Sequence, residues 1–413
     1  MEVGRERSEP IPGYQGSSSA TDQDIWNHMA GSGERSERKQ RGATRSKRDT
    51  PRPRPQPTEP GERKSRGRHG AAADADGRHG SRQGSRGGGR VGSVEEQLQA
   101  IESSGGSGTV QVARGKTLEL SSLDKIYFPA IGATKGELMR YYARVAPLIL
   151  PLLADRPLVL KRSPEGVEGE TFFQQKPPAG IPATVRVEPI PAPVVDGERG
   201  KPERRVVGGD LATLLYAVQL GCISMDPWFS RVGNMEHADY AILDLDPGPE
   251  AGFAGVVRAA LLVHEQLEQL GLRSALKTSG SRGLHIALPL PRGTSYESAL
   301  GLAESIATRV AAAHPEETTI ERSLAERPPT AVYLDYLQNA RGKSVACAYC
   351  ARARKGATVS TPLHWSELGN ALDPGSFTIR SVPERLEELG DIWGDAMQRA
   401  NTRKALASTL SKE

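Results

Sequence analysis

The stretch that decides the fold reads ADYAILDLDPG, residues 238–248. It has the apolar content of a buried strand, yet it carries two carboxylates, Asp244 and Asp246, one residue apart. Side chains at positions i and i+2 of a strand lie on the same face, about 6.6 Å apart along the chain. The two carboxylates therefore project together, and their repulsion raises the pKa of each unless a cation shares the site.

Two interpretations of this pair compete. Hard oxygen ligands side by side at the end of a strand, before a Pro-Gly turn, suit Mg²⁺ or Mn²⁺. Alternatively, one aspartate caps the turn or the following helix and has a structural role. A D-x-D pair alone is short and common, so by itself it favours the structural role. The decision rests on the other segments of the chain.

Strand and helix patterns alternate on both sides of this stretch. Thr134 and Glu137 form the S/T-x-x-E pattern of a capping box, which predicts a helix from residue 135 onward. Further helices are expected over 209–221, 249–271 and 295–315, and strands over 121–129, 157–164, 170–178, 273–290 (two strands joined by a Gly-rich turn) and 330–339, with a looped hairpin in 179–205. This interleaving predicts a mixed α/β (α+β) fold with helices packed on a sheet.

The N-terminal part of the 413-residue chain differs in composition from the rest. Residues 1–95 are rich in Arg, Gly, Ser and Pro and hold 19 Lys+Arg and 13 Asp+Glu, a net charge of +6. The remainder holds 54 − 19 = 35 basic and 50 − 13 = 37 acidic residues, a net charge of −2. Because so few large apolar residues cannot offset the entropy of ordering, we expect a disordered tail over 1–107 and a folded domain over 108–413.

The tail has two possible roles. Arg/Gly-rich segments attract nucleic acid without sequence preference. A solvated extension without a defined role is an equally weighted alternative.

Composition also bears on location. The chain has no run of about 18 apolar residues and no apolar signal region, so neither a membrane span nor export by that route is expected. Three cysteines, Cys222, Cys347 and Cys350, are too few for a disulfide framework and fit a reducing cytoplasm.

Residues 278–285, TSGSRGLH, form a Gly-rich turn that carries Ser279, Ser281, Arg282 and His285. Closely spaced backbone N–H groups, hydroxyls and a guanidinium can hold a phosphate. His285 begins an apolar strand, and alone it is more often a buried, hydrogen-bonded core histidine.

Two further segments follow along the chain. Asp335 in AVYLDYLQN is a single charge in an apolar run, and either a third carboxylate ligand of a two-metal site or the partner of a nearby arginine. Residues 341–356 carry Arg341, Lys343, Arg352, Arg354 and Lys355 without an acidic residue. Such a run is usually a solvated face, but beside bound metals it would attract anions.

Taken in order, DLDPG (244–248), TSGSRGLH (278–285), LDYLQNARGKS (334–344) and ARARKGATVSTPLHW (351–365) resemble the polymerase domain of bacterial ATP-dependent DNA ligase D. The upstream segments 123–142 and 160–178 are also similar to this family, so the resemblance covers about residues 115–398. The family belongs to the archaeo-eukaryotic primase superfamily. The resemblance therefore implies a primase-like catalytic core, with helices packed on mixed sheets, and a nucleotidyltransferase activity.

The resemblance also implies a role for each matching residue. Asp244, Asp246 and Asp335 would bind two divalent metal ions, Mn²⁺ or Mg²⁺. The incoming NTP or dNTP would be held by Ser279, Arg282, Gly283, His285, Lys343, Arg352 and Arg354. DNA would be contacted by Lys125 and Lys135 at the 5′-phosphate of a gap, by Lys161 near the template and nucleotide, and by Phe172 and Phe173 through stacking on template bases.

The implied function is template-directed addition of nucleotides, ribonucleotides preferred, to a primer 3′-hydroxyl at gaps and double-strand-break ends in non-homologous end joining. DNA ends, gapped duplex, NTPs and Ku are the implied partners. No K-x-D-G ligase motif occurs, so sealing is expected from a separate ATP-dependent ligase. The alternatives are a non-catalytic DNA-end binding module, a primase that starts strands de novo, and a metal-dependent nuclease or phosphatase.

Besides the missing K-x-D-G motif, the sequence departs from the family pattern at two places. Asp226 stands where the family usually has a histidine near the nucleotide, so sugar selection or rate is expected to differ. Cys347 and Cys350 form a C-x-x-C where the family has no fixed cysteines. Without a second ligand pair this is weak evidence for zinc.

Overall fold

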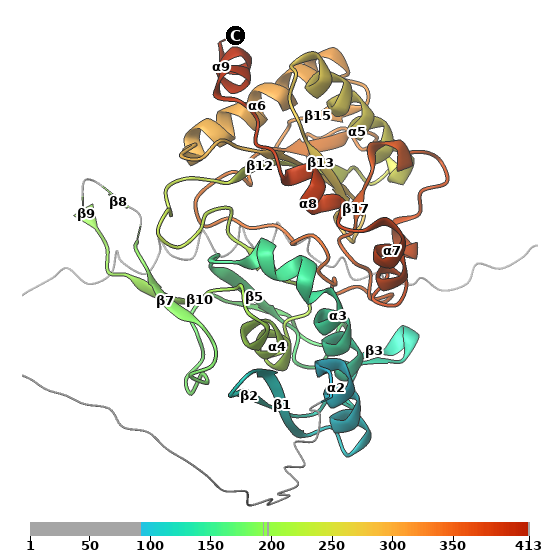
Figure 1. Ribbon diagram of the computed structural model, residues 1–413. Coiled ribbons are helices and arrows are strands. Elements are labelled where there is room, and N and C mark those ends of the chain that lie inside the picture. Colours follow the sequence, from blue (N-terminus) through green and yellow to red (C-terminus); the bar gives the residue numbers. More distant parts are fainter. Residues whose placement is uncertain (1–91, 193, 196–197, 412–413) are drawn as a thin grey trace, which may run out of the picture. The chain divides into compact units, whose positions relative to one another are not determined.

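A computed structural model describes residues 92–192, 194–195 and 198–411 of the chain (Figure 1). All of them belong to one compact unit, Arg86–Glu413. The expected disorder of residues 1–91 and its attraction to nucleic acid lie outside the described residues.

The ordered part begins earlier than the predicted boundary between residues 107 and 108. Helix α2 (Val94–Ser103) starts at a capping box, in which Ser93 accepts from the Glu96 N–H and Glu96 accepts from the Ser93 N–H. Leu98 and Ile101 on this helix are buried in the core. The assignment of residues 94–107 to a disordered tail is therefore wrong, because a short amphipathic helix follows directly on the Gly-rich segment.

The N-terminal half continues with small sheets and two longer helices. Strands β1 (Gly108–Ala113) and β2 (Lys116–Leu120) form a first hairpin. Strands β3 (Ile126–Phe128) and β4 (Ala133–Thr134) form a second hairpin, with the 3₁₀ turn η2 (Pro129–Ile131) between them. Helix α3 (Lys135–Leu153) follows. Thr134 caps α3 by accepting from the Glu137 N–H, so the predicted helix start is confirmed. A three-stranded sheet has the order β11 (Asp226–Pro227), β5 (Leu158–Arg162), β6 (Phe172–Gln174). Helix α4 is Leu211–Gln219.

The predicted hairpin in 179–205 is also present. Strands β7 (Val187–Ile190) and β10 (Glu203–Val206) pair in antiparallel fashion, and β8 (Val194–Val195) and β9 (Glu198–Arg199) extend the same hairpin.

Six of the described strands form the central sheet. Their order is β15 (Thr318–Thr319), β16 (Val332–Asp335), β12 (Tyr240–Pro247), β14 (Leu284–Pro289), β13 (Ala275–Thr278), β17 (Pro362–Leu363). All neighbours are antiparallel except β15 and β16. The mixed sheet with helices packed on it confirms the predicted fold class.

The two faces of this sheet are buried against different partners. Leu243, Leu245 and Leu276 share a core with apolar residues of α5 (Gly252–Gln269) and α6 (Tyr296–Ala313), which contact the sheet (Figure 1). On the opposite face, Ala275 and Ala287 belong to a core formed mainly by the N-terminal half. The sheet therefore lies between α5/α6 and the N-terminal elements.

The C-terminal part carries only short helices. They are η3 (Trp365–Glu367), η4 (Pro374–Ser376), α7 (Val382–Leu389), α8 (Ile392–Met397) and α9 (Arg403–Leu410). Within the described residues, no helix combines the length and the apolar character that a membrane crossing requires.

Candidate functional site

A row of four polar side chains crosses the central sheet. The strand register places Asp244 on β12 opposite both Asp335 on β16 and His285 on β14, and His285 opposite Lys277 on β13. Side chains that are directly opposite in antiparallel strands lie on one face, with Cβ atoms about 4.5–5.5 Å apart. We call these four residues, Lys277, His285, Asp244 and Asp335, the polar row.

Asp246 lies beside the polar row. It follows Asp244 by two residues on the same strand and is opposite Tyr333. The structure thus brings together the three aspartates singled out in the sequence, although Asp335 is 91 residues from Asp244 in the chain.

Asp335 is almost completely buried, with 2% of the residue exposed. Its carboxylate accepts hydrogen bonds from the Leu337 N–H (2.8 Å) and from Gln338 Nε2 (2.9 Å). Burial and the neighbouring charge of Asp244 raise the Asp335 pKa, and the two hydrogen bonds counteract only part of that rise. Gln338 was not singled out in the sequence, although it follows Asp335 by three residues.

Asp246 is exposed, but the surrounding protein still desolvates its carboxylate. This burial, followed by the charges of Asp244 and Asp335, raises the Asp246 pKa, while Arg327 and Arg282 lower it. Arg327 is another charged neighbour that the sequence analysis missed.

The donor set fits divalent cations. Three carboxylates are hard oxygen ligands, and their mutual repulsion is what a shared cation would offset. Within the part of the chain that the structure describes, no three His, Cys, Asp or Glu side chains are already arranged as ligands of one ion. Asp335, for example, is turned toward Leu337 and Gln338.

His285 and Lys277 make up the other half of the polar row. His285 Nε2 lies 3.2 Å from Asp244 Oδ1, and His285 Nδ1 lies 2.6 Å from Lys277 Nζ. Burial, then the charges of Lys277 and Arg352, hold the His285 pKa well below its usual value, so the ring is neutral at pH 7. Lys277 is not predicted from the sequence, although a lone charge in the apolar run SALKT (274–278) was the available signal.

The Gly-rich turn between β13 and β14 is held tightly. Ser279 Oγ accepts from the N–H groups of Ser281 and Gly283, so these two amides point into the turn. A Cβ atom on Gly283 would lie 2.2 Å from the Leu245 carbonyl oxygen, so glycine allows the turn to approach β12. Arg352 Nη1 donates to the Ser279 carbonyl (2.7 Å). The turn lies beside the aspartates, and the amides of Ser281 and Gly283 are already hydrogen-bonded within it.

Three other predicted nucleotide contacts differ in their surroundings. Arg282 is exposed, and its positive charge lowers the Asp246 pKa. Lys343 is half-buried beside Asp335, and burial lowers its pKa. Arg354 is exposed on the segment after Arg352. Arg282 and Lys343 are therefore cations beside the carboxylate cluster.

The two lysines predicted to bind a 5′-phosphate are neighbours. The Lys135 N–H donates to the Lys125 carbonyl (2.8 Å). Lys135 is 4% exposed, and its Nζ donates to the Ser121 carbonyl and to Gln219 Oε1, both at 2.9 Å. Burial, then the charge of Lys125, lowers the Lys135 pKa to about 8. Lys125 forms an ion pair with Glu165 (2.5 Å).

The predicted aromatic pair is divided between two environments. Strand β6 pairs with β5 so that Phe172 is opposite Arg162 and Phe173 is opposite Lys161. Phe172 is 40% exposed, with the Arg162 guanidinium 5.1 Å from its ring centre. Phe173 is half-buried against a small core cluster, with Lys161 Nζ 5.4 Å from its ring centre. Phe172 is therefore the better exposed of the two for stacking.

The two departures from the family pattern lie close together. Asp226 accepts from Ser224 Oγ (2.5 Å), and that hydroxyl lies 3.8 Å from Cys350 Sγ. Cys347 and Cys350 are buried, and burial raises the pKa of both thiols. They are therefore protonated at neutral pH, a state that does not favour metal ligation.

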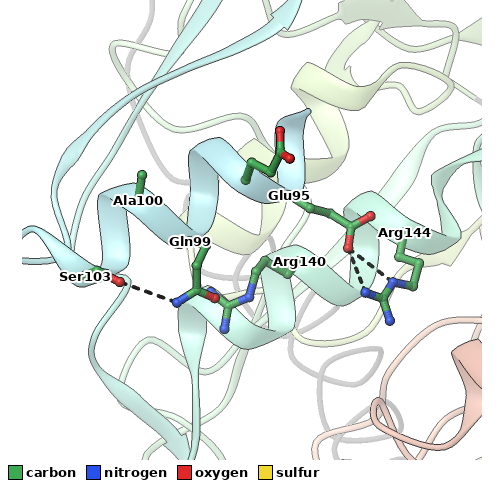
Figure 2. Close-up of a pocket in the computed structure, with 7 residues that line it drawn as sticks. Glu95, Gln99, Ala100, Ser103, Arg140 and Arg144 are labelled. Atoms are coloured by element: carbon green, nitrogen blue, oxygen red, sulfur yellow. Dashed lines mark hydrogen bonds and ion pairs between the residues drawn. The ribbon is translucent and has the colours of Figure 1, made fainter. Parts of the chain in front are cut away.

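A shallow hollow elsewhere on the molecule is lined by none of the predicted site residues. Figure 2 shows it between α2 and α3, where Glu95 forms an ion pair with Arg144 (3.1 Å). Its other lining residues are Glu96, Gln99, Ala100, Ser103 and Arg140. It belongs to the contact between these helices and not to the polar row.

The central sheet, with three aspartates gathered beside a Gly-rich turn, defines the chain as a nucleotidyltransferase of the primase-polymerase class. Residues 134–393 match the model of the LigD primase-polymerase domain, and the chain belongs to that family. This confirms the family and the enzyme class expected from the motifs.

Relatives and a solved structure agree with this assignment. The chain is 34% identical over 299 residues to the multifunctional non-homologous end joining protein LigD of Pseudomonas aeruginosa, covering 72% of this chain and 34% of the relative. It is 32% identical over 274 residues to the bifunctional non-homologous end joining protein LigD of Bacillus subtilis, covering 66% and 43%. The polymerase domain of Mycobacterium tuberculosis ligase D in complex with DNA matches with a TM-score of 0.62 and 28% identity, over 69% of this chain and 99% of that chain. The chain thus spans between a third and a half of the length of these two relatives.

Proposed function

We propose that the chain is a template-directed polymerase that adds nucleotides, with ribonucleotides preferred, to a primer 3′-hydroxyl at gaps and double-strand-break ends during non-homologous end joining. The observation that carries this proposal is the register of β12 and β16, which brings Asp244, Asp246 and Asp335 together beside the Gly-rich turn. Membership of the LigD primase-polymerase family supports it.

In this proposal the three aspartates hold two divalent cations. Bound there, Mg²⁺ or Mn²⁺ lowers the pKa of the attacking hydroxyl and neutralises charge on the reacting phosphates. The chain positions the triphosphate with cations around the cluster, and its contacts are assigned to Ser279, Arg282, Gly283, His285, Lys343, Arg352 and Arg354. Such positioning and charge neutralisation are the main protein contributions to phosphoryl chemistry.

DNA is assigned to a second group of residues. Lys125 and Lys135 lie together and offer two cations to a terminal 5′-phosphate. Lys161 and the exposed ring of Phe172 lie on the paired strands β5 and β6, where a template base can stack. Phe173 contributes from its half-buried position.

The cellular setting is inferred from the relatives. Both are described as non-homologous end joining proteins with more than one function, and this chain matches only part of each. We therefore assign the chain to the bacterial cytoplasm, at DNA ends, with Ku and an ATP-dependent DNA ligase as partners.

The deciding experiment uses a labelled gapped duplex with a downstream 5′-phosphate. Wild-type protein, the variant Asp244→Ala/Asp246→Ala and the surface control Asp395→Ala are incubated with Mn²⁺ or Mg²⁺ and with rNTPs or dNTPs. Template-directed lengthening by the wild type and the control, but not by the double variant, supports the proposal.

Other outcomes identify the alternatives. DNA binding without lengthening under any condition would indicate that the chain is a non-catalytic DNA-end binding module. Products formed on a template without a primer would indicate a primase that starts strands. Shortening of the primer instead of lengthening would indicate a nuclease.

A further inference from the structure

Lys277 lies behind His285 in the polar row, on the side away from Asp244. It is 1% exposed, and its Nζ contacts His285 Nδ1 (2.6 Å) and Ser360 Oγ (2.7 Å). The ring of Trp393 lies 5.8 Å from the same nitrogen. The register of β13, β14 and β12 makes this a continuous line from Lys277 through His285 to Asp244.

The direction of these hydrogen bonds follows from the chemistry of the groups. A lysine ammonium has only donors. Ser360 Oγ donates its own hydrogen to the Thr278 carbonyl (2.8 Å), so it accepts from Lys277. His285 Nδ1 must then accept as well, and a neutral imidazole with an accepting Nδ1 carries its hydrogen on Nε2. That nitrogen is the one within 3.2 Å of Asp244 Oδ1.

We propose that Lys277 is a positioning residue of the polymerase site, which fixes His285 in the Nε2–H tautomer and thereby holds the Asp244 carboxylate in one orientation. This inference rests on the proposed function and extends it to a residue that contacts none of the aspartates assigned to the metals. A hydrogen-bonded group behind a ligating side chain commonly sets its orientation in metal sites.

The burial of Lys277 supports a functional reason for its presence. Taking an ammonium out of water is costly, and an apolar side chain of similar length would fill the same space. Burial lowers the Lys277 pKa to about 8, which leaves the ammonium form dominant at pH 7. The charge is thus retained in the interior, where it can polarise the imidazole ring.

The first measurement needs no metal and no substrate. Protein labelled with ¹⁵N-histidine is prepared as wild type, Lys277→Met and Lys277→Arg, with Lys404→Met as an exposed control for the loss of one lysine. The His285 signals, assigned with His285→Gln, give the tautomer from long-range ¹H–¹⁵N couplings. We expect the Nε2–H form in the wild type, the control and the arginine variant, and a mixture or the Nδ1–H form in Lys277→Met.

Mn²⁺ affinity and nucleotide addition are measured on the same proteins. We expect Lys277→Met to lose about 10–100-fold in Mn²⁺ affinity or in kcat, as for other partners behind metal ligands, with recovery in Lys277→Arg. Thermal unfolding reports whether each variant is folded.

A folded Lys277→Met protein that keeps the Nε2–H tautomer, or that changes tautomer with unaltered Mn²⁺ affinity and kcat, overturns the proposal. An Nδ1–H form in the wild type overturns it before any variant is made. Failure of the proposed function is distinguishable, because a wild type that adds no nucleotide still reports its tautomer and its Mn²⁺ affinity.

Discussion

At the scale of single residues, repulsion among the three clustered aspartates lowers the stability of the fold. The Asp246 pKa is raised by burial and by its like-charged neighbours. A carboxyl group whose folded pKa lies above its unfolded value contributes stability at low pH, and that stability is lost as the pH rises through the folded pKa. At neutral pH without metal, the crowded carboxyl groups therefore weaken the fold.

Asp246→Asn is expected to separate activity from stability. Nucleotide addition should fall by more than about 100-fold, because even partners behind metal ligands cost 10–100-fold. In EDTA the melting temperature should rise by roughly 1–3 °C, a small gain because the residue is exposed and screened. Differential scanning fluorimetry with and without Mn²⁺ measures this, and an unchanged or lower melting temperature in EDTA would argue against charge repulsion.

The lowered pKa of Lys135 gives a prediction about pH. Its pKa of about 8 means that the ammonium form is lost as the pH rises from 7 to 9. The advantage of a gap with a 5′-phosphate over one without should therefore decline over this range. With Lys135→Arg, the preference for a gap with a 5′-phosphate should persist to higher pH, since a guanidinium stays charged. A phosphate effect that is equal at pH 7 and pH 9 in the wild type would remove Lys135 from the phosphate site.

At the scale of elements, the close approach of the Gly-rich turn to β12 depends on Gly283. Gly283→Ala places a Cβ atom against the Leu245 carbonyl and should destabilise the protein by about 1–3 kcal/mol. Activity should fall with it, because the clash lies between the strands that carry Asp244 and His285.

Gly301→Ala is the matched control for this substitution. Gly301 lies within α6, and an added Cβ atom would meet only ordinary contact with Leu410 at 3.5 Å. Alanine is favoured over glycine in a helix, so a gain of up to about 1 kcal/mol is expected. Urea unfolding of both variants tests the difference, and equal effects would contradict the assigned role of Gly283.

We expect different effects from substituting the two adjacent phenylalanines of β6, because one ring is exposed and the other is half-buried. Phe172→Ala should leave stability nearly unchanged but cost about 1–3 kcal/mol of template binding, if a base stacks on the exposed ring. Phe173→Ala should cost stability, about 1–3 kcal/mol, because a half-buried ring loses part of the 3–5 kcal/mol of a core phenylalanine. Fluorescence anisotropy and chemical denaturation separate the two, and identical behaviour would contradict this division.

The sequence predicted elements more reliably than contacts. The capping box at Thr134 and the alternation around residues 238–248 follow local rules, so the helix start and the central strand were foreseeable. That Asp335 is opposite Asp244 depends on pairing between strands 91 residues apart, which no local pattern shows. The aspartates were therefore found by family resemblance and residue type. Lys277 depends on the pairing of β13 with β14, which no local pattern shows. Gln338 lies only three residues after Asp335, but its residue type does not mark it as a hydrogen-bond donor to a buried carboxylate.

At the scale of the whole molecule, helix α2 belongs to the folded unit. Its Glu102 forms an ion pair with Arg140 of α3, and Gln97 Oε1 accepts from the Gln111 N–H of β1. The buried side chains of Leu98 and Ile101 join the core of the N-terminal half. Residues 94–103, which the sequence analysis assigned to the tail, thus form a helix of the folded unit.

Two truncations test the role of α2. Removing residues 1–104 should cost about 3–6 kcal/mol through the loss of two buried apolar side chains. Removing residues 1–85, which stops at the boundary of the compact unit, should leave the melting temperature unchanged. Calorimetry of both proteins measures this, and equal melting temperatures would mean that α2 is dispensable for the fold.

The register that assembles the polar row has a consequence for the gene. Because successive strand residues face opposite sides of a sheet, a shift of one residue would turn Asp244 and Asp246 toward α5 and α6 and bring leucines to the other face. We therefore expect insertion or deletion of a single codon within 240–247 to abolish activity, even though the reading frame is preserved. By contrast, the Leu372 N–H donates to the Gly369 carbonyl (3.1 Å) in a turn outside the sheet, where we expect whole-codon changes to alter only the length of the turn.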